Sequence, residues 1–264
     1  MSSSAVAGEA GDVVLDVTGL TKAFGGVRAV ESLDFVVHKS RITSLIGPNG
    51  AGKTTAFNAI TGVLRADSGS VLLAGHNLAK RRPDEIARLG LGRTYQNIRL
   101  FQHLTCLENV LVARNFRQKA SLVEALVGWR TERRERRVEE GLARSLMERV
   151  GLRGVEDKYP RELPYGDQRR LEIARALALE PTVLALDEPT AGMSANEAEA
   201  VVALISELQT TGLAILLIEH NMNIVMDISD RIVVMNFGRK IAEGPPETVR
   251  TDPGVIEAYL GAEA

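Results

Sequence analysis

The C-terminal half of the chain contains three runs of apolar residues, each about as long as one β-strand. They are TVLAL (182–186), LAILLI (213–218) and RIVVM (231–235), and helical patterns separate them. A strand with alternating apolar and polar residues has one solvent-exposed face, whereas a continuously apolar strand is buried on both faces. The alternation of such strands with helices predicts an α/β fold with a mainly parallel sheet.

Strand-like runs also occur near the N-terminus, and four of them precede residue 76. They are VVLDV (13–17), LDFVV (33–37), ITSLI (42–46) and SVLLAG (70–75), the last directly after the turn ADSG. β-branched and apolar residues bounded by turn residues favour strands. The sequence therefore predicts a second group of strands before the helical middle of the chain.

The helical, largely polar pattern in the middle of the chain indicates an insert within the α/β core. We expect the core to comprise 13–95 and 160–245, and the helical insert to comprise 96–159. Residues 1–12 are small and polar, so we expect a disordered tail there. Residues 246–264 are expected to form a helical tail.

The composition is that of an ordinary globular chain. The 264 residues are 45% hydrophobic and 25% charged, with a net charge of −2, which gives no electrostatic reason to expect nucleic acid as a partner. Cys106 is the only cysteine, so we expect a reduced, buried thiol. We expect neither a signal peptide nor a membrane span, because no apolar run approaches ~18 residues.

The stretch GPNGAGKTT (47–55) matches the phosphate-binding pattern G-x-x-x-x-G-K-[ST] and stands between a predicted strand and a predicted helix. Its glycines let the backbone curl so that N–H groups surround phosphate oxygens. Lys53 is expected to reach the outer phosphates and the Thr54 hydroxyl to bind Mg²⁺. The candidate nucleotide-binding residues are Gly47, Pro48, Asn49, Gly50, Ala51, Gly52, Lys53, Thr54 and Thr55.

Two adjacent acids end one of the apolar strands, in TVLALDEPT. Neighbouring strand residues point in opposite directions, so we expect Asp187 and Glu188 to have different tasks. We assign Asp187 to the metal, through a water molecule, and Glu188 to polarising the attacking water. Pro189 is expected to keep Glu188 extended, because the residue before a proline is biased away from helical geometry.

Three further polar or aromatic positions are candidates because of where they stand. His220 follows the strand LAILLI, at the edge where α/β sheets bind ligands, and we interpret it as a γ-phosphate sensor. Gln96 follows the strand-like GRTY at the start of the insert, where its amide can contact Mg²⁺ or water. Phe24 precedes a Gly-Gly turn and is either a core aromatic or a ring that stacks on adenine.

Taken in order, these motifs resemble ATP-binding cassette (ABC) transporter ATPases, and the resemblance covers nearly the whole chain after residue 12. It implies ATP and Mg²⁺ as ligands, an antiparallel N-terminal β subdomain and a helical subdomain. The segments YGDQRRLEIARAL, EPTAGM and DPGVIEAYLG resemble the larger ATPase of branched-chain amino acid importers. Urea and amide importers and lipopolysaccharide exporters share much of this pattern.

The helix start LPYGDQRR (163–170) presents backbone N–H groups, and the resemblance implies what they face. In this family two ATPase domains dimerise head to tail, and each signature helix caps the γ-phosphate held by its partner. The residues expected to act in this way are Tyr165, Gly166, Asp167 and Gln168. Pro164 replaces the family's serine, Asp167 replaces its glutamine, and Ser194 stands where the family has an aspartate. We expect Asp167 to repel the partner's phosphate and to weaken one composite site, whereas an Asp167 turned to solvent or paired with Arg169 or Arg170 would not.

The resemblance also implies the assembly. We expect two membrane permease subunits, a second ATPase subunit (a heterodimer being favoured), an extracytoplasmic substrate-binding protein, and a place on the cytoplasmic face of the inner membrane. The apolar helical face of SLVEALVGW (121–129) either packs in the core or receives a permease helix. A soluble ABC ATPase of translation or DNA repair and a P-loop kinase or GTPase remain as alternatives.

Overall fold

The computed structural model describes residues 12–118 and 129–260. The apolar face predicted within 121–129, formed by Leu122, Val123, Leu126 and Val127, lies outside this part of the chain, as do residues 1–11 of the predicted tail. The described residues form two compact units. Of the described residues, the first unit contains those up to Arg93, Thr182–Glu188 and those from Ile205 onward, and the second contains those between Thr94 and Pro181 and Pro189–Leu204.

An antiparallel sheet with the strand order β2-β1-β4-β5 forms one part of the first unit. Its strands are β1 (Val13–Phe24), β2 (Val27–His38), β4 (Ser68–Leu73) and β5 (His76–Asn77). β1 and β2 form a hairpin that pairs Val13 with His38 at one end and Phe24 with Val27 at the other. The apolar runs 13–17 and 33–37 are therefore parts of two longer strands, whose remaining residues are more polar.

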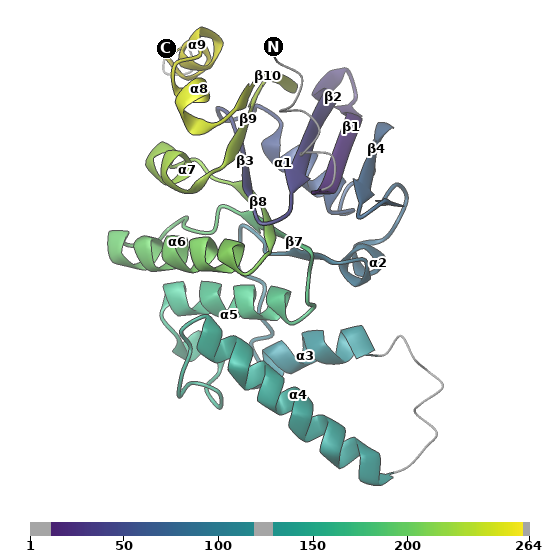
Figure 1. Cartoon of the computed structure of the whole chain (residues 1–264), viewed down its shortest axis with the longest axis vertical. Helices are drawn as coiled ribbons and strands as arrows, with labels where there is room; N and C mark the ends of the chain where they lie inside the picture. The colour runs from purple at the N-terminus through teal and green to yellow at the C-terminus, as the bar shows by residue number, and fades with distance from the viewer. Residues whose placement is uncertain (1–11, 119–128, 261–264) are drawn as a thin grey trace, which may run out of the picture. The chain divides into compact units, whose positions relative to one another are not determined.

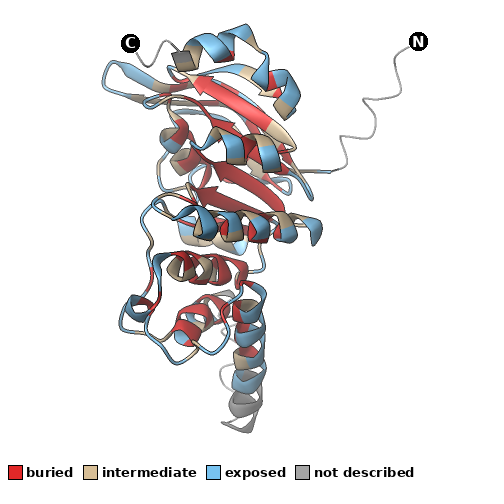
Figure 2. Cartoon of the chain, turned by 90° about the vertical axis from the view of Figure 1, so that its left-hand side faces the viewer, coloured by how far each residue is buried: buried red, intermediate tan, exposed pale blue. Residues whose placement is uncertain are grey.

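The second sheet of this unit has six strands in the order β10-β9-β3-β8-β7-β6 (Figure 1). They are β3 (Ile42–Ile46), β6 (Leu91–Arg93), β7 (Val183–Asp187), β8 (Ala214–Ile218), β9 (Arg231–Asn236) and β10 (Arg239–Gly244). The pairs from β6 to β9 are parallel, and β10 is antiparallel to β9. Every residue of β3, β7 and β8 is buried, and the central strands of the sheet are red in Figure 2. The mainly parallel sheet expected from the apolar runs is confirmed.

Two hydrophobic clusters hold the helices of the first unit in place. The helices are α1 (Lys53–Ile60), α2 (Pro83–Arg88), α7 (Met222–Ile228), α8 (Pro246–Arg250) and α9 (Pro253–Leu260). The larger cluster joins α1 to both sheets, and the smaller packs α7, α8 and α9 against the ends of β3 and β9. The strand that precedes the phosphate-binding pattern is thus fixed from both sides.

The second unit is helical, with α3 (Cys106–Gln118), α4 (Trp129–Arg149), a 3₁₀ turn η2 (Pro160–Glu162), α5 (Tyr165–Leu177) and the first part of α6 (Ala195–Thr210). Cys106 is fully buried, as expected. The predicted insert ended at 159, whereas this unit also includes α5. The reason is its packing: α5 lies against α3 and α4, and Arg114 of α3 forms an ion pair with Glu180, just beyond the end of α5.

None of the helices in the described part of the chain combines the length and the apolar character that a bilayer crossing requires.

Candidate functional site

The loop between β3 and α1 can be built only with glycine at two of its positions. Gly47 has φ 151° and Gly52 has φ 99°, in the region that side chains disfavour. A Cβ atom on Gly47 would lie 2.1 Å from the carbonyl oxygen of Met235, and one on Gly52 would lie 2.1 Å from that of Ala29. The loop backbone therefore sits directly against the surrounding chain.

Lys53 begins α1 and is buried within this loop. Its ammonium group donates to the carbonyl oxygens of Gly47, at 2.6 Å, and Pro48, at 3.0 Å. Burial lowers the pKa of Lys53, and the carboxylate of Glu188 acts in the opposite direction. The α1 N-terminus has neither a side-chain cap nor an acidic residue in its first turn. An anion placed there would gain both the helix N–H groups and the lysine.

Asp187 is the last residue of β7 and is 3% exposed. Glu188 follows it with φ 46°, so the expectation that Pro189 keeps Glu188 extended is wrong. The Glu188 N–H donates to the carbonyl of Ile218 at 2.9 Å, which anchors this left-handed residue to β8. Left-handed backbone is strained for a residue with a side chain, and such strain occurs often at functional sites.

His220 lies next to Glu188, as the strand order requires, because β7 and β8 are neighbours. Its Nδ1 is 3.8 Å from a carboxylate oxygen of Glu188 and 3.8 Å from one of Glu219. The His220 ring is 60% exposed, whereas the Glu219 side chain is fully buried and accepts the N–H groups of His220 and Asn221. Glu219 thus fixes the backbone that carries the imidazole, a task that the sequence did not reveal.

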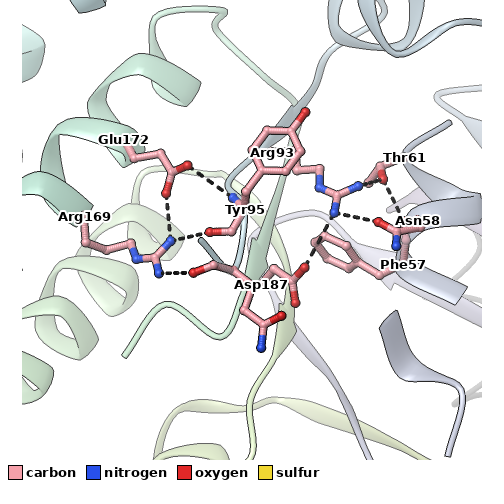
Figure 3. Close-up of polar contacts among 9 residues, drawn as sticks. Phe57, Asn58, Thr61, Arg93, Tyr95, Arg169, Glu172 and Asp187 are labelled. Carbon is pink, nitrogen blue, oxygen red and sulfur yellow. Dashed lines mark hydrogen bonds and ion pairs between the residues drawn. The ribbon is translucent and has the colours of Figure 1, made fainter. Parts of the chain in front are cut away.

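Arg93, at the end of β6, lies 3.5 Å from the Asp187 carboxylate, and both side chains are almost buried (Figure 3). It also donates to Asn58, at 2.7 Å, and to Thr61, and its guanidinium lies 4.7 Å from the centre of the Phe57 ring. Asp187 is therefore tied to α1. Sequence reasoning missed Arg93, and its only signal was a charged residue at the end of an apolar strand.

The donor set near the loop fits a magnesium ion that arrives with a nucleotide. In the described residues, no group of three or more His, Cys, Asp or Glu side chains could hold a metal by itself. Mg²⁺ in phosphate sites needs only one or two protein ligands, because phosphate oxygens and waters supply the others. The exposed Thr54 hydroxyl and the Asp187 carboxylate are of the right chemical type.

Phe24 ends β1, and its ring is 52% exposed, so it is not a core aromatic. The Lys22 ammonium lies 5.5 Å from the ring centre and forms an ion pair with Asp67 at 2.7 Å. An exposed aromatic ring of this kind can stack on a flat ligand.

The signature candidates lie in the second unit, at the start of α5. Pro164 occupies the cap position without a side-chain cap, and Tyr165 is 41% exposed. The Gly166 N–H donates to a carboxylate oxygen of Glu197 at 3.3 Å, and the Gln168 amide donates to Leu163. Glu197 is held in place by the Ser194 hydroxyl, at 2.7 Å, and those hydrogen bonds keep the pKa of the carboxyl below its usual range.

Asp167 lies 3.5 Å from the guanidinium of Arg170, one turn further along α5. A neighbouring cation offsets the negative charge that would face an incoming phosphate. This is the arrangement in which Asp167 is expected not to repel the phosphate. Gln96 belongs to the second unit as well: its side chain is exposed, and its carbonyl oxygen accepts a hydrogen bond from Arg169 at 2.8 Å.

A glycine-dependent loop after a central buried strand, with a lysine at the next helix start, defines the class of P-loop nucleotide-binding proteins. Residues 30–191 match the family described as ABC transporter. Residues 239–264 match the one described as branched-chain amino acid ATP-binding cassette transporter. The chain belongs to the ABC transporter family of ATP-binding proteins, for which ATP hydrolysis is the implied activity.

Relatives match the chain over nearly its whole length. The high-affinity branched-chain amino acid transport ATP-binding protein LivG of Escherichia coli (strain K12) is 44% identical over 94% of this chain and 98% of its own. The protein BraF of Pseudomonas aeruginosa, which bears the same description, is 43% identical with the same coverage.

Solved structures agree with the fold. A nucleotide-free ATP-binding cassette from an ABC transporter has a TM-score of 0.80 and 32% identity, and covers 94% of this chain and 98% of its own. The ADP conformation of an ATP-binding cassette of an ABC transporter also has a TM-score of 0.80. Its sequence is 31% identical, and the match covers 94% of this chain and 99% of its own. The expected fold class and the expected family resemblance are confirmed.

Proposed function

We propose that this chain is the ATP-hydrolysing subunit of a membrane importer of branched-chain amino acids. The observation that carries the proposal is the 44% identity to LivG across almost the full length of both chains. The separate match of residues 239–264 to a branched-chain family supports it. The chain would act at the cytoplasmic face of the membrane with two permeases, a second ATPase and an extracytoplasmic binding protein.

In this proposal the P-loop holds the phosphates of ATP, with Lys53 on the outer ones, and Phe24 stacks on adenine. Thr54 and Asp187, the latter through water, hold Mg²⁺, which supplies positive charge against the phosphate oxygens. Glu188 accepts a proton from the attacking water, His220 donates to the γ-phosphate, and Gln96 contacts the water or the metal. The 3.8 Å separation of Glu188 and His220 supports their action at one phosphate.

The signature helix would act on a partner's nucleotide. In a head-to-tail dimer the N–H groups at the start of α5, chiefly that of Gly166, would cap the γ-phosphate held by the other ATPase. These N–H groups lie at the N-terminus of α5, a 13-residue helix, and the helix dipole favours an anion at the N-terminus. The Gly166 N–H would have to exchange its bond to Glu197 for one to phosphate.

The test compares Glu188→Gln with Lys53→Ala, and with Glu199→Gln as a matched control on an exposed stretch of α6. Glu188→Gln should bind ATP, lose most phosphate release and accumulate an ATP-bound dimer in gel filtration. Lys53→Ala should weaken ATP binding itself, and the control should match the wild type. Wild-type turnover in Glu188→Gln would remove Glu188 from its assigned role.

The substrate is tested in cells. Deleting the gene should lower uptake of labelled leucine, isoleucine and valine, and the wild-type gene, but not the Glu188→Gln gene, should restore it. Unchanged uptake of all three, with loss of urea or amide uptake, would reassign the substrate.

A further inference from the structure

A fully buried ion pair lies on α5, directly after the signature residues. The Arg169 guanidinium is 2.7 Å from the Glu172 carboxylate, and neither side chain has any solvent exposure. Removing two charges from water is costly unless hydrogen bonds satisfy the remaining donors and acceptors. The partners of this pair therefore indicate its purpose.

Those partners are backbone groups of one short segment. Arg169 donates to the carbonyl oxygens of Tyr95, at 2.5 Å, and Gln96, at 2.8 Å. Glu172 accepts the N–H groups of Tyr95 and Arg99, both at 3.3 Å. Figure 3 shows the two side chains reaching from α5 to Tyr95.

The segment that they hold has no regular structure, since the residues between β6 and α3 form neither helix nor strand. Backbone groups in such a segment have no ladder to pair with, so side chains must satisfy them when they are buried. Arg169 and Glu172 supply that pairing on both sides of Gln96. The backbone at Gln96 is thereby held against α5.

Stability alone is a weak explanation for the pair. Buried ion pairs are often replaceable by apolar residues at no loss of stability. Within the described structure, the Arg169 Nε is also a buried donor without a hydrogen-bond partner, which costs stability. The feature that the pair does provide is a rigid connection between Gln96 and the signature helix.

We propose that Arg169 and Glu172 are positioning residues that make Gln96 and the signature helix move as one body, and so couple the two ATP sites of the dimer. The proposal rests on the proposed function, in which Gln96 contacts the chain's own nucleotide and Gly166 caps that of the partner. A shift of Gln96 on binding ATP then shifts the cap on the second ATP. Such a coupling appears as positive cooperativity.

A matched control exists in the same unit. Arg114 of α3 and Glu139 of α4 form a pair at 2.6 Å in which each side chain is 9% exposed. The pair joins α3 to α4, and Arg114 also forms an ion pair with Glu180. Loss of this pair should affect stability without affecting the coupling.

The experiment measures ATP hydrolysis against ATP concentration in the assembled transporter, for Arg169→Met/Glu172→Leu and for Arg114→Met/Glu139→Leu. The wild type and the control should give a Hill coefficient above 1, and the Arg169/Glu172 variant should give about 1. Fluorescent-nucleotide binding to the isolated subunit should stay within about twofold of wild type, because the P-loop is intact.

If the double variant does not fold, Arg169→Lys serves instead, since an ammonium group cannot hold both carbonyl oxygens as the guanidinium fork does. It should lower the Hill coefficient while the chain keeps the circular-dichroism spectrum of the wild type, and Glu172→Gln should retain part of the cooperativity between the ATP sites. An unchanged Hill coefficient in a folded Arg169 variant, or an equal loss in the control, overturns the proposal. Absence of hydrolysis in the wild-type assembly would instead refute the proposed function.

Discussion

Replacing Arg93 by methionine should destabilise the first unit by about 3–5 kcal/mol, because it leaves the buried Asp187 carboxylate without this cation. The two groups are 3.5 Å apart, with side chains that are 11% and 5% exposed. At an effective dielectric of ~20 their attraction is about 5 kcal/mol. Methionine keeps the apolar stem that packs near Phe57, so the loss comes mainly from the charge and its hydrogen bonds.

Urea unfolding followed by circular dichroism measures the effect. With a slope of roughly 3 kcal/mol per molar urea, expected for a chain of this size, the midpoint should fall by about 1 M or more. Hydrogen exchange of β6, β7 and α1 should increase, which assigns the loss to the first unit. An unchanged slope would indicate that the native state itself was destabilised.

The control is Arg41→Met. Arg41 lies closer to its partner, Asp230, at 2.6 Å, but its side chain is 61% exposed. Exposed pairs contribute about 0–1 kcal/mol despite good geometry, because water screens them. If the two variants lose equal stability, burial does not decide the energy of the Arg93 pair, and the reasoning from solvent exposure fails.

Three further outcomes are expected. Gln96→Ala should leave ATP affinity nearly intact but raise the ATP consumed per substrate moved in reconstituted transporter; an unchanged ratio would exclude Gln96 from the coupling. Asp167→Gln should change the ATPase rate by less than about twofold at any salt concentration, because Arg170 already offsets the charge; a several-fold gain that grows at low salt would contradict this. Burial raises the pKa of the Cys106 thiol to about 11, so a thiol reagent at pH 8 should label the native chain about 100-fold more slowly than the urea-unfolded chain. Rapid labelling of native protein would contradict the burial of Cys106.

Much of the first unit could be predicted because its signals are local. The phosphate-binding pattern lies between a strand and a helix, as expected, since glycine and lysine at fixed spacing impose a local shape. The acids at the end of β7 and the histidine after β8 come together because buried parallel strands end at one edge of a sheet. The left-handed backbone of Glu188 was not predictable from Pro189. The hydrogen bond from the Glu188 N–H to the carbonyl of Ile218 overrides the preference for extended backbone before a proline.

What could not be predicted depends on contacts between residues far apart in the sequence. Arg93 reads as an ordinary basic residue until β6 is known to pair with β7. Arg169 and Glu172 have the spacing of an exposed helical ion pair, and nothing local indicates that both are buried against the segment around Gln96. The same holds for Asp167: the sequence offers Arg169 and Arg170 as partners for its charge, but only the structure places Arg170 at 3.5 Å.

The position of β3 in its sheet has a consequence for how the protein is made. β3 carries the P-loop, yet its two neighbours, β8 and β9, begin only at Ala214 and Arg231. At about 5–20 residues per second, the ribosome needs on the order of ten seconds or more to deliver those strands after β3. Until then the backbone N–H and C=O groups on both edges of β3 lack their strand partners, and no nucleotide can be held on an assembled sheet. A message truncated before β9 therefore yields a chain with an exposed aggregation-prone strand rather than a weaker ATPase.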